Sequence, residues 1–173
     1  TNAPFYKPFW AVTLDALRYS CAKLGLDLKA NAQERLMNQY RALSAFPENK
    51  GVLQALQTKG IPTGILSNGD PAMLNVAISS AGLNGWLDHV LSADTVKQYK
   101  THPSVYALGP QALGLPAHDI LFVSSNGWDA LGATWYGFQT IWLNRQGLPF
   151  ETLGPQPTHI ATNLNDVLQL FHP

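Results

Sequence analysis

The chain has 173 residues and a formal net charge of zero, and 46% of its residues are hydrophobic while only 13% are charged. This composition is typical of a globular chain with a sizeable core, and it excludes a chain that is disordered as a whole. The sequence contains no basic or acidic run that would indicate nucleic acid or a membrane surface as a partner, and no apolar stretch approaches the roughly 18 residues of a membrane span.

Cys21 is the only cysteine, so no disulfide can form within the 173 residues. We therefore expect a reducing, cytoplasmic setting, and the N-terminal residues also lack the apolar run of a signal peptide. The helical spacing of apolar residues around Cys21 predicts that it packs as a small hydrophobe and is not a nucleophile.

Residues 1–46 are predicted to form a small helical unit. Apolar residues recur at spacings of three and four between Trp10 and Leu24, and Gly25 offers a stop for that helix. A second helix is predicted over residues 36–43, ending near Phe46.

From residue 47 to residue 173, predicted strands and helices alternate. The predicted strands are Gly64–Leu66, His89–Leu91, 120–123, Thr140–Leu143 and His159–Ala161. The predicted helices between them cover residues 52–59, 71–78, 105–113 and 129–136, and a last helix is predicted to begin after a cap at Asn163. This alternation predicts an α/β core with an open, parallel sheet.

Polar side chains collect where the predicted strands end. Ser67 and Asn68 end one strand, residues 124–126 (Ser-Ser-Asn) end another, and Lys100 follows a third. Ligands of open parallel sheets bind outside these carboxyl ends, and the helices that follow Asn68 and residue 126 add positive dipole ends. Together they predict a site for an anion, although each residue alone could be a helix cap, a turn residue or a solvated lysine.

Other catalytic constellations fit the sequence less well. The five histidines show no metal-ligand spacing, and we interpret them as structural or surface residues: His89, His102, His118, His159 and His172. The string Gly64–Gly69 has one residue too many for the Gly-x-Ser-x-Gly elbow of serine hydrolases.

Three motifs of the chain are distinctive: Leu66-Ser67-Asn68-Gly69, Tyr99-Lys100 with Tyr106, and Phe122-Val123-Ser124-Ser125-Asn126-Gly127-Trp128-Asp129. Together they resemble the haloacid dehalogenase superfamily, and more narrowly its type II L-2-haloacid dehalogenases. The similarity covers nearly the whole chain, from Phe9-Trp10 to Ile141-Trp142-Leu143-Asn144-Arg145. It implies a Rossmann-like core with a small helical cap, of which residues 1–46 would be a remnant.

The resemblance implies hydrolysis of short L-2-haloalkanoic acids to D-2-hydroxy acids, with no metal and no organic cofactor. In the family an aspartate attacks C2 of the substrate and expels halide, and water then hydrolyses the resulting ester. Phosphatases of the superfamily instead place a pair of acids at the third motif to hold Mg²⁺. Here serines and an asparagine accompany the single carboxylate of Asp129, which is too little for a hard dication.

The same resemblance implies roles for the residues that handle the substrate. Ser67 and the backbone of Asn68 would bind the substrate carboxylate, and the Asn68 side chain would help to receive the halide. Lys100 would orient the nucleophile and offset its charge, and Tyr106 and Ser124 would support the lysine.

The remaining implied roles concern water and the apolar wall of the site. Asn126 and Asp129 would place and activate the water that attacks the ester. Phe9 and Trp128 would form a dry wall around C2 and the halogen. The alternative for Phe9 and Trp128 is ordinary core packing.

The family's first motif, a strand that ends in Asp-x-Tyr-Gly-Thr and carries the nucleophile, does not occur in the chain. We therefore expect the chain to be a fragment, and a sheet without that central strand to have two unpaired apolar edges. Asp70 and Asp94 are alternative acids for the attack, but Asp70 before Pro71 is explained as a helix cap.

Two other functions stay open at this point. One is a Mg²⁺-dependent phosphatase of the same superfamily. The other is a catalytically dead binding module, which the missing nucleophile favours and the joint presence of Lys100 and Asp129 disfavours. From the family alone we also expect a homodimer.

Overall fold

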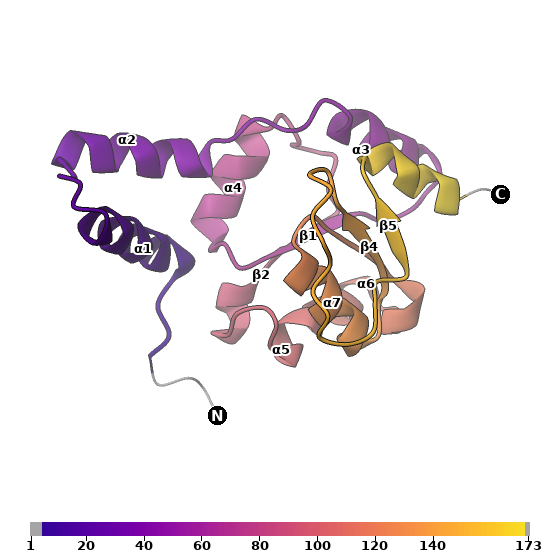
Figure 1. Cartoon of the computed structure of the whole chain (residues 1–173). Helices are drawn as coiled ribbons and strands as arrows, with labels where there is room; N and C mark the ends of the chain where they lie inside the picture. The colour runs from indigo at the N-terminus through magenta and orange to yellow at the C-terminus, as the bar shows by residue number, and fades with distance from the viewer. Residues whose placement is uncertain (1–4, 172–173) are drawn as a thin grey trace.

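The computed structural model describes residues 5–171, so the predicted interpretation of His172 lies outside the described residues. The α-helices are α1 (Phe9–Lys23), α2 (Ala30–Arg41), α3 (Asn49–Thr58), α4 (Pro71–Ser80), α5 (Pro103–Tyr106), α6 (Leu108–Leu113) and α7 (Gly127–Tyr136). The 3₁₀ helices are η1 (Ala93–Val96), η2 (Ala117–Asp119) and η3 (Leu164–Leu170). The strands are β1 (Gly64–Ser67), β2 (His89–Ser92), β3 (Leu121–Ser124), β4 (Gln139–Leu143) and β5 (His159–Ala161) (Figure 1).

All strand pairs in this structure are parallel, which confirms the predicted α/β class. β1 pairs with β2 from Gly64 opposite His89 to Ser67 opposite Ser92. β3 pairs with β4, and β4 pairs with β5. Because parallel strands end at the same edge of a sheet, this register aligns the polar residues that follow them.

The strands form two sheets, one of the order β1-β2 and one of the order β3-β4-β5. Within residues 5–171, β1 and β3 therefore each have one edge with no strand partner, as expected for a sheet that lacks a strand between them. Leu66 of β1 and Phe122 of β3 both pack against the apolar cluster around Tyr106, which links the two sheets. Both strands are only partly buried along their length.

Helices cover both faces of the larger sheet (Figure 1). On one face, Val52 and Leu56 of α3 pack with Ile141, Ala161 and Val167 in an apolar cluster. On the other face lies a second cluster, formed by Tyr106, Ala133 and Phe138. Ile141 belongs to the first cluster, whereas its neighbour Trp142 points to the other face, as the alternation along a strand requires.

Most helix boundaries follow their predicted signals. Asp70 caps α4 by accepting a hydrogen bond from the Met73 backbone N–H at 3.0 Å, and Gly60 follows the C-cap of α3 with a φ of +69°. The predicted single helix over residues 105–113 is wrong, because the structure has α5 and α6 on either side of Ala107. Pro110 has no N–H to donate to the carbonyl four residues earlier, so a continuous helix would lose a hydrogen bond there.

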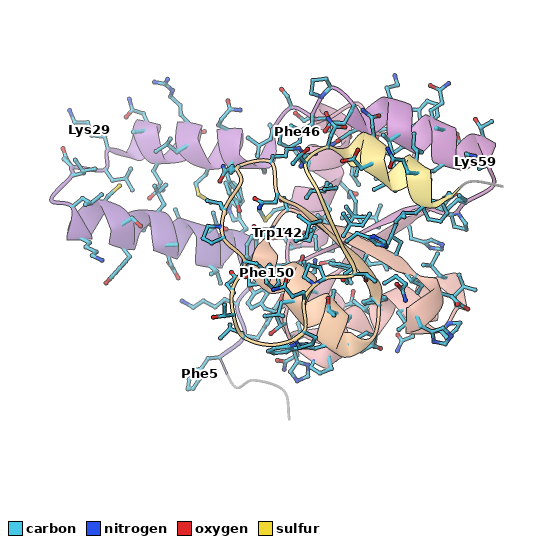
Figure 2. The ribbon with its side chains drawn as sticks, turned by 45° about the vertical axis from the view of Figure 1, so that its right-hand side comes forward. Phe5, Lys29, Phe46, Lys59, Trp142 and Phe150 are labelled. Atoms are coloured by element: carbon cyan, nitrogen blue, oxygen red, sulfur yellow. The ribbon has the colours of Figure 1, made fainter. Side chains whose placement is uncertain are left out.

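The N-terminal helices α1 and α2 form a hairpin that extends beside the rest of the molecule, with Lys29 at its tip (Figures 1 and 2). α2 ends at Arg41, earlier than predicted, and the Gln39 side chain donates to the carbonyl of Ala42 where the chain leaves the helix. Met37 is the buried residue of α2, whereas Leu36 on its outer face is 51% exposed. In residues 5–171, no helix is both long and apolar enough to cross a membrane.

Candidate active site

Lys100 and Asp129 form a buried ion pair at the centre of the predicted site. The Lys100 Nζ atom lies 2.9 Å from Asp129 Oδ2, and the two side chains are only 8% and 5% exposed. Asp129 belongs to the first turn of α7, where the positive end of the helix dipole favours a carboxylate. Lys100 comes from the loop between η1 and α5, so residues far apart in the chain meet at this point.

Two hydroxyl groups complete the surroundings of the Asp129 carboxylate. The buried Tyr106 hydroxyl donates to Oδ1 at 2.9 Å, and the Ser124 hydroxyl donates to Oδ2 at 2.9 Å. Both carboxylate oxygens of Asp129 therefore have donors. Full hydrogen bonding is the condition under which a buried ion pair is tolerated.

Burial changes the proton affinities of this centre. It lowers the pKa of the Lys100 ammonium from its ordinary value, and the neighbouring Asp129 carboxylate opposes that change. Burial, together with the Asp129 charge, raises the pKa of the Tyr106 hydroxyl above its usual range. Tyr106 is thus held as a proton donor to the carboxylate at all ordinary pH values.

The turn after β1 joins this centre through Asn68. The Asn68 Oδ1 atom accepts a hydrogen bond from the Lys100 backbone N–H at 2.8 Å. Ser67 Oγ accepts one from the Gly69 N–H at 3.0 Å, and the Ser92 hydroxyl donates to the Gly69 carbonyl at 2.7 Å. The predicted convergence of the three polar clusters is therefore present in the structure.

Asn126, Trp128 and Phe9 are less buried than this centre. Ser124 Oγ accepts a hydrogen bond from the Asn126 backbone N–H at 3.2 Å, and the Asn126 residue itself is exposed. Trp128 is 42% exposed, which argues against the alternative of core packing for its ring. Phe9 is partly buried and meets the Tyr99 ring edge-on, with 5.8 Å between the ring centroids.

The alternative acids make other contacts. Asp70 caps α4 and also accepts a hydrogen bond from the Trp10 backbone N–H at 3.3 Å. Asp94 accepts the Tyr6 hydroxyl at 2.6 Å and pairs with Lys97 at 2.7 Å. Both carboxylates thus have structural partners of their own.

The positions of His102 and His118 fit the predicted structural or surface role of the histidines. His102 caps α5 by accepting the Ser104 backbone N–H at 3.3 Å, and His118 is exposed. In the described part of the chain, no three His, Cys, Asp or Glu side chains come together in a way that could hold a metal ion.

Two features of the site were not predicted from the sequence. The direct pairing of Lys100 with Asp129 was missed, because the lysine was expected to face the nucleophile. The contact of Ser92 with the turn after β1 was missed as well. The polar string Ser92-Ala93-Asp94, which directly follows an apolar strand in the same way as Ser67, was the available signal.

Comparisons with known proteins agree with the geometry. Residues 5–137 match the family model described as haloacid dehalogenase-like hydrolase. The (S)-2-haloacid dehalogenase of Pseudomonas sp. (strain YL) is 46% identical over 166 residues, which are 96% of this chain and 72% of that relative.

Solved structures give the same answer. A crystal structure of an L-2-haloacid dehalogenase superposes with a TM-score of 0.95 at 56% identity, covering 98% of this chain and 74% of the other. The L-2-haloacid dehalogenase of Xanthobacter autotrophicus, with chloropropionic acid covalently bound, gives a TM-score of 0.86 at 31% identity, covering 95% and 76%. These similarities confirm the resemblance that the three motifs indicated. The chain belongs to the haloacid dehalogenase-like hydrolases.

Proposed function

We propose that the chain is the larger part of an enzyme that hydrolyses short L-2-haloalkanoic acids to D-2-hydroxy acids. The observation that carries this proposal is the buried centre formed by Lys100, Asp129, Tyr106 and Ser124. Its single carboxylate is neutralised by the Lys100 ammonium, whereas a phosphatase needs a pair of acids to hold Mg²⁺. The similarity to proteins named as L-2-haloacid dehalogenases supports it and does not favour the phosphatase alternative.

The nucleophile in this proposal is an aspartate on a further strand, which pairs between β1 and β3. Both strands have a free edge in the described residues, and Leu66 and Phe122 leave apolar surface partly exposed beside those edges. Such a strand would be parallel to its neighbours, so its carboxyl end would lie at the same edge as Lys100. The relative with 46% identity is longer than the aligned region, since this chain spans 72% of it.

The reaction would proceed in two displacements. The carboxylate oxygen attacks C2 of the substrate, the carbon–halogen bond breaks, and the halide leaves with the bonding electrons. Water then attacks the carbonyl carbon of the ester and gives up a proton, which releases the hydroxy acid with inverted configuration at C2 and restores the aspartate.

In this scheme Lys100 balances the charge of the nucleophile, and Tyr106 and Ser124 fix Lys100 indirectly through Asp129. Asn126 and Asp129 position the water and help to remove its proton. Exclusion of water from the site makes the carboxylate of the attacking aspartate a stronger nucleophile.

The turn after β1, together with Phe9 and Trp128, binds the substrate in this scheme. Ser67 and the Asn68 backbone bind the carboxylate group of the substrate. The Asn68 Oδ1 atom accepts a hydrogen bond from the Lys100 backbone N–H, so the side-chain N–H groups of Asn68 remain to bind the halide. Phe9 and Trp128 provide the apolar wall, and the 42% exposure of Trp128 supports this role because the residue is not buried in the core.

We further propose that residues 1–46 are a cap, that residues 47–173 are the core, and that the protein is a cytoplasmic homodimer. The single cysteine supports a reducing compartment. Leu36, Tyr40 and Leu43 lie three or four residues apart on α2 and just beyond its end, and they are 51%, 46% and 54% exposed, which supports a paired surface there. A Leu36→Glu variant should shift light-scattering mass from dimer to monomer, and a monomeric wild type would end this part of the proposal.

The reaction is tested by stereochemistry. The complete protein is incubated separately with L- and D-2-chloropropionate, and chloride and the chirality of lactate are measured. We expect chloride from the L enantiomer alone and D-lactate as the product. L-lactate from the L enantiomer would exclude a single inversion at C2, and the absence of chloride would overturn the proposal.

A further inference from the structure

Trp142 of β4 contacts the loop that carries Asn126. Its side chain is almost fully buried, at 4% exposure of the residue, and its indole Nε1–H donates a hydrogen bond of 3.2 Å to the Ser125 carbonyl oxygen. Trp142 lies directly opposite Ser124 in the register of β3 and β4. The indole therefore reaches the loop at the point where β3 ends.

That hydrogen bond and one other hold the same peptide group. The Ser125 carbonyl and the Asn126 N–H belong to one planar peptide unit, whose atoms turn together. Trp142 binds its oxygen, and Ser124 Oγ accepts its N–H at 3.2 Å. With both ends bonded, the plane has a fixed orientation, although Ser125 and Asn126 are themselves exposed.

The orientation of this peptide decides where the Asn126 side chain begins. Asn126 is the N-cap residue of α7, with a φ of −90° and a ψ of 120°, and it makes no side-chain capping bond. The side-chain amide of Asn126 is therefore not used to cap the helix. A rotation of the preceding peptide would move that amide relative to the buried Asp129 one turn further on.

Trp142 is itself held from the other side. The Phe150 ring packs on it with 5.1 Å between the ring centroids, and Figure 2 shows the two labelled side chains next to each other. The next residue, Glu151, lies against Gly127, since a Cβ atom on Gly127 would approach its Oε2 atom to 2.5 Å. The segment after β4 thus braces both the indole and the start of α7.

We infer that Trp142 is a positioning residue, which orients Asn126 for the water-dependent second step through the Ser125–Asn126 peptide. The inference rests on the proposed function, because it assigns Trp142 to the step in which water attacks the ester. Ring packing alone would make Trp142 an ordinary core residue, and the indole N–H is what distinguishes the two roles.

The test compares Trp142→Phe with Trp135→Phe in the complete protein. Trp142→Phe keeps an aromatic ring against Phe150 and removes the N–H donor. Trp135 lies on the outer face of α7 and is 56% exposed, so Trp135→Phe is the matched control. Chloride release is followed before and during the steady state, and amide hydrogen exchange is followed over residues 124–128.

We expect kcat of Trp142→Phe to fall about tenfold, because a misplaced catalytic group commonly costs one or two orders of magnitude. KM should fall or stay unchanged, and a pre-steady-state burst of chloride should appear because the ester accumulates. The Asn126 and Gly127 amides should exchange faster than in wild type. The control should match wild type in all of these measurements.

Wild-type kcat without a burst in Trp142→Phe would overturn the inference, and so would unchanged amide exchange. Faster exchange throughout the sheet would also overturn it, because the tryptophan would then be a general core residue. If the wild-type protein released no chloride, the proposed function would fail, and the exchange data would still decide whether Trp142 orients this peptide.

Discussion

At the scale of single residues, the buried pair of Lys100 and Asp129 is the centre of the proposed active site. Lys100→Ala removes the positive charge that would balance a nucleophilic carboxylate and leaves Asp129 buried without its partner. We expect kcat/KM for L-2-chloropropionate to fall by about 10²–10³, as the loss of a preorganised electrostatic group usually causes. The free energy of unfolding should fall by about 3–5 kcal/mol.

Lys59→Ala is the matched control for this change. Lys59 is an exposed residue at the end of α3 and lies away from Trp142 in Figure 2. Its replacement should leave both quantities unchanged. Turnover of Lys100→Ala near the wild-type level would show that the lysine has another role.

The pH dependence follows from the environment of Lys100. Burial lowers its pKa below the ordinary value of 10.5, so the ammonium should lose its proton at a lower pH than in an exposed lysine. We expect the alkaline limb of kcat/KM to begin below pH 10.5. The unfolded chain binds this proton more tightly than the folded chain does. The contribution of Lys100 to the free energy of unfolding therefore rises as the pH increases from the pKa of the folded state to that of the unfolded state. A kcat/KM profile that stayed level through this range would contradict the assignment.

The position of the site residues could be predicted from the sequence, but their pairing could not. Lys100, Ser124 and Asp129 each follow a strand end, and parallel strands bring such residues to one edge. Which oxygen of Asp129 receives which donor depends on the packing of α5 against α7, which places the Tyr106 hydroxyl at Oδ1. Tertiary packing of that kind leaves no periodic signal in the sequence.

At the scale of elements, α7 depends on a glycine to approach the site. A Cβ atom on Gly132 would lie 2.7 Å from both Thr101 Cγ2 and Tyr106 Oη. Gly132→Ala should therefore lower the free energy of unfolding by about 1–3 kcal/mol through overpacking. It should also displace the Tyr106 hydroxyl and reduce kcat.

Gly51→Ala in α3 is the opposite case and serves as the control. A Cβ atom there meets nothing within 4 Å, and the helix gains the better propensity of alanine. The free energy of unfolding of the Gly51→Ala variant should exceed that of wild type by about 0.5–1 kcal/mol. Urea unfolding of both variants measures the difference, and equal values for the two would show that α7 does not pack as closely as described.

Element types followed from the sequence more reliably than element ends. Apolar runs bounded by turn residues predicted all five strands that residues 5–171 contain, and the signals at Asp70 and Gly60 predicted a helix start and a helix end. The break at Ala107 was missed because the apolar spacing continues across it. The proline three residues later removes a backbone donor without interrupting that spacing.

At the scale of the whole molecule, the division into two sheets is the main structural feature. One edge of β1 and one edge of β3 have no strand partner within residues 5–171, whereas β4 is paired on both sides. In the chain of 173 residues alone, backbone amides of β1 and β3 should exchange with deuterium faster than those of β4. Equal protection of all three strands would mean that another contact covers these edges.

Hydrolytic dehalogenation can be separated from phosphate hydrolysis in a single assay. Purified complete protein is incubated with L-2-chloropropionate in the presence of a metal chelator, and free chloride is measured, with p-nitrophenyl phosphate and Mg²⁺ as a parallel substrate. We expect steady chloride release that the chelator does not change, and no release of phosphate. Phosphate release that depends on Mg²⁺, without any chloride, would contradict it and identify a phosphatase.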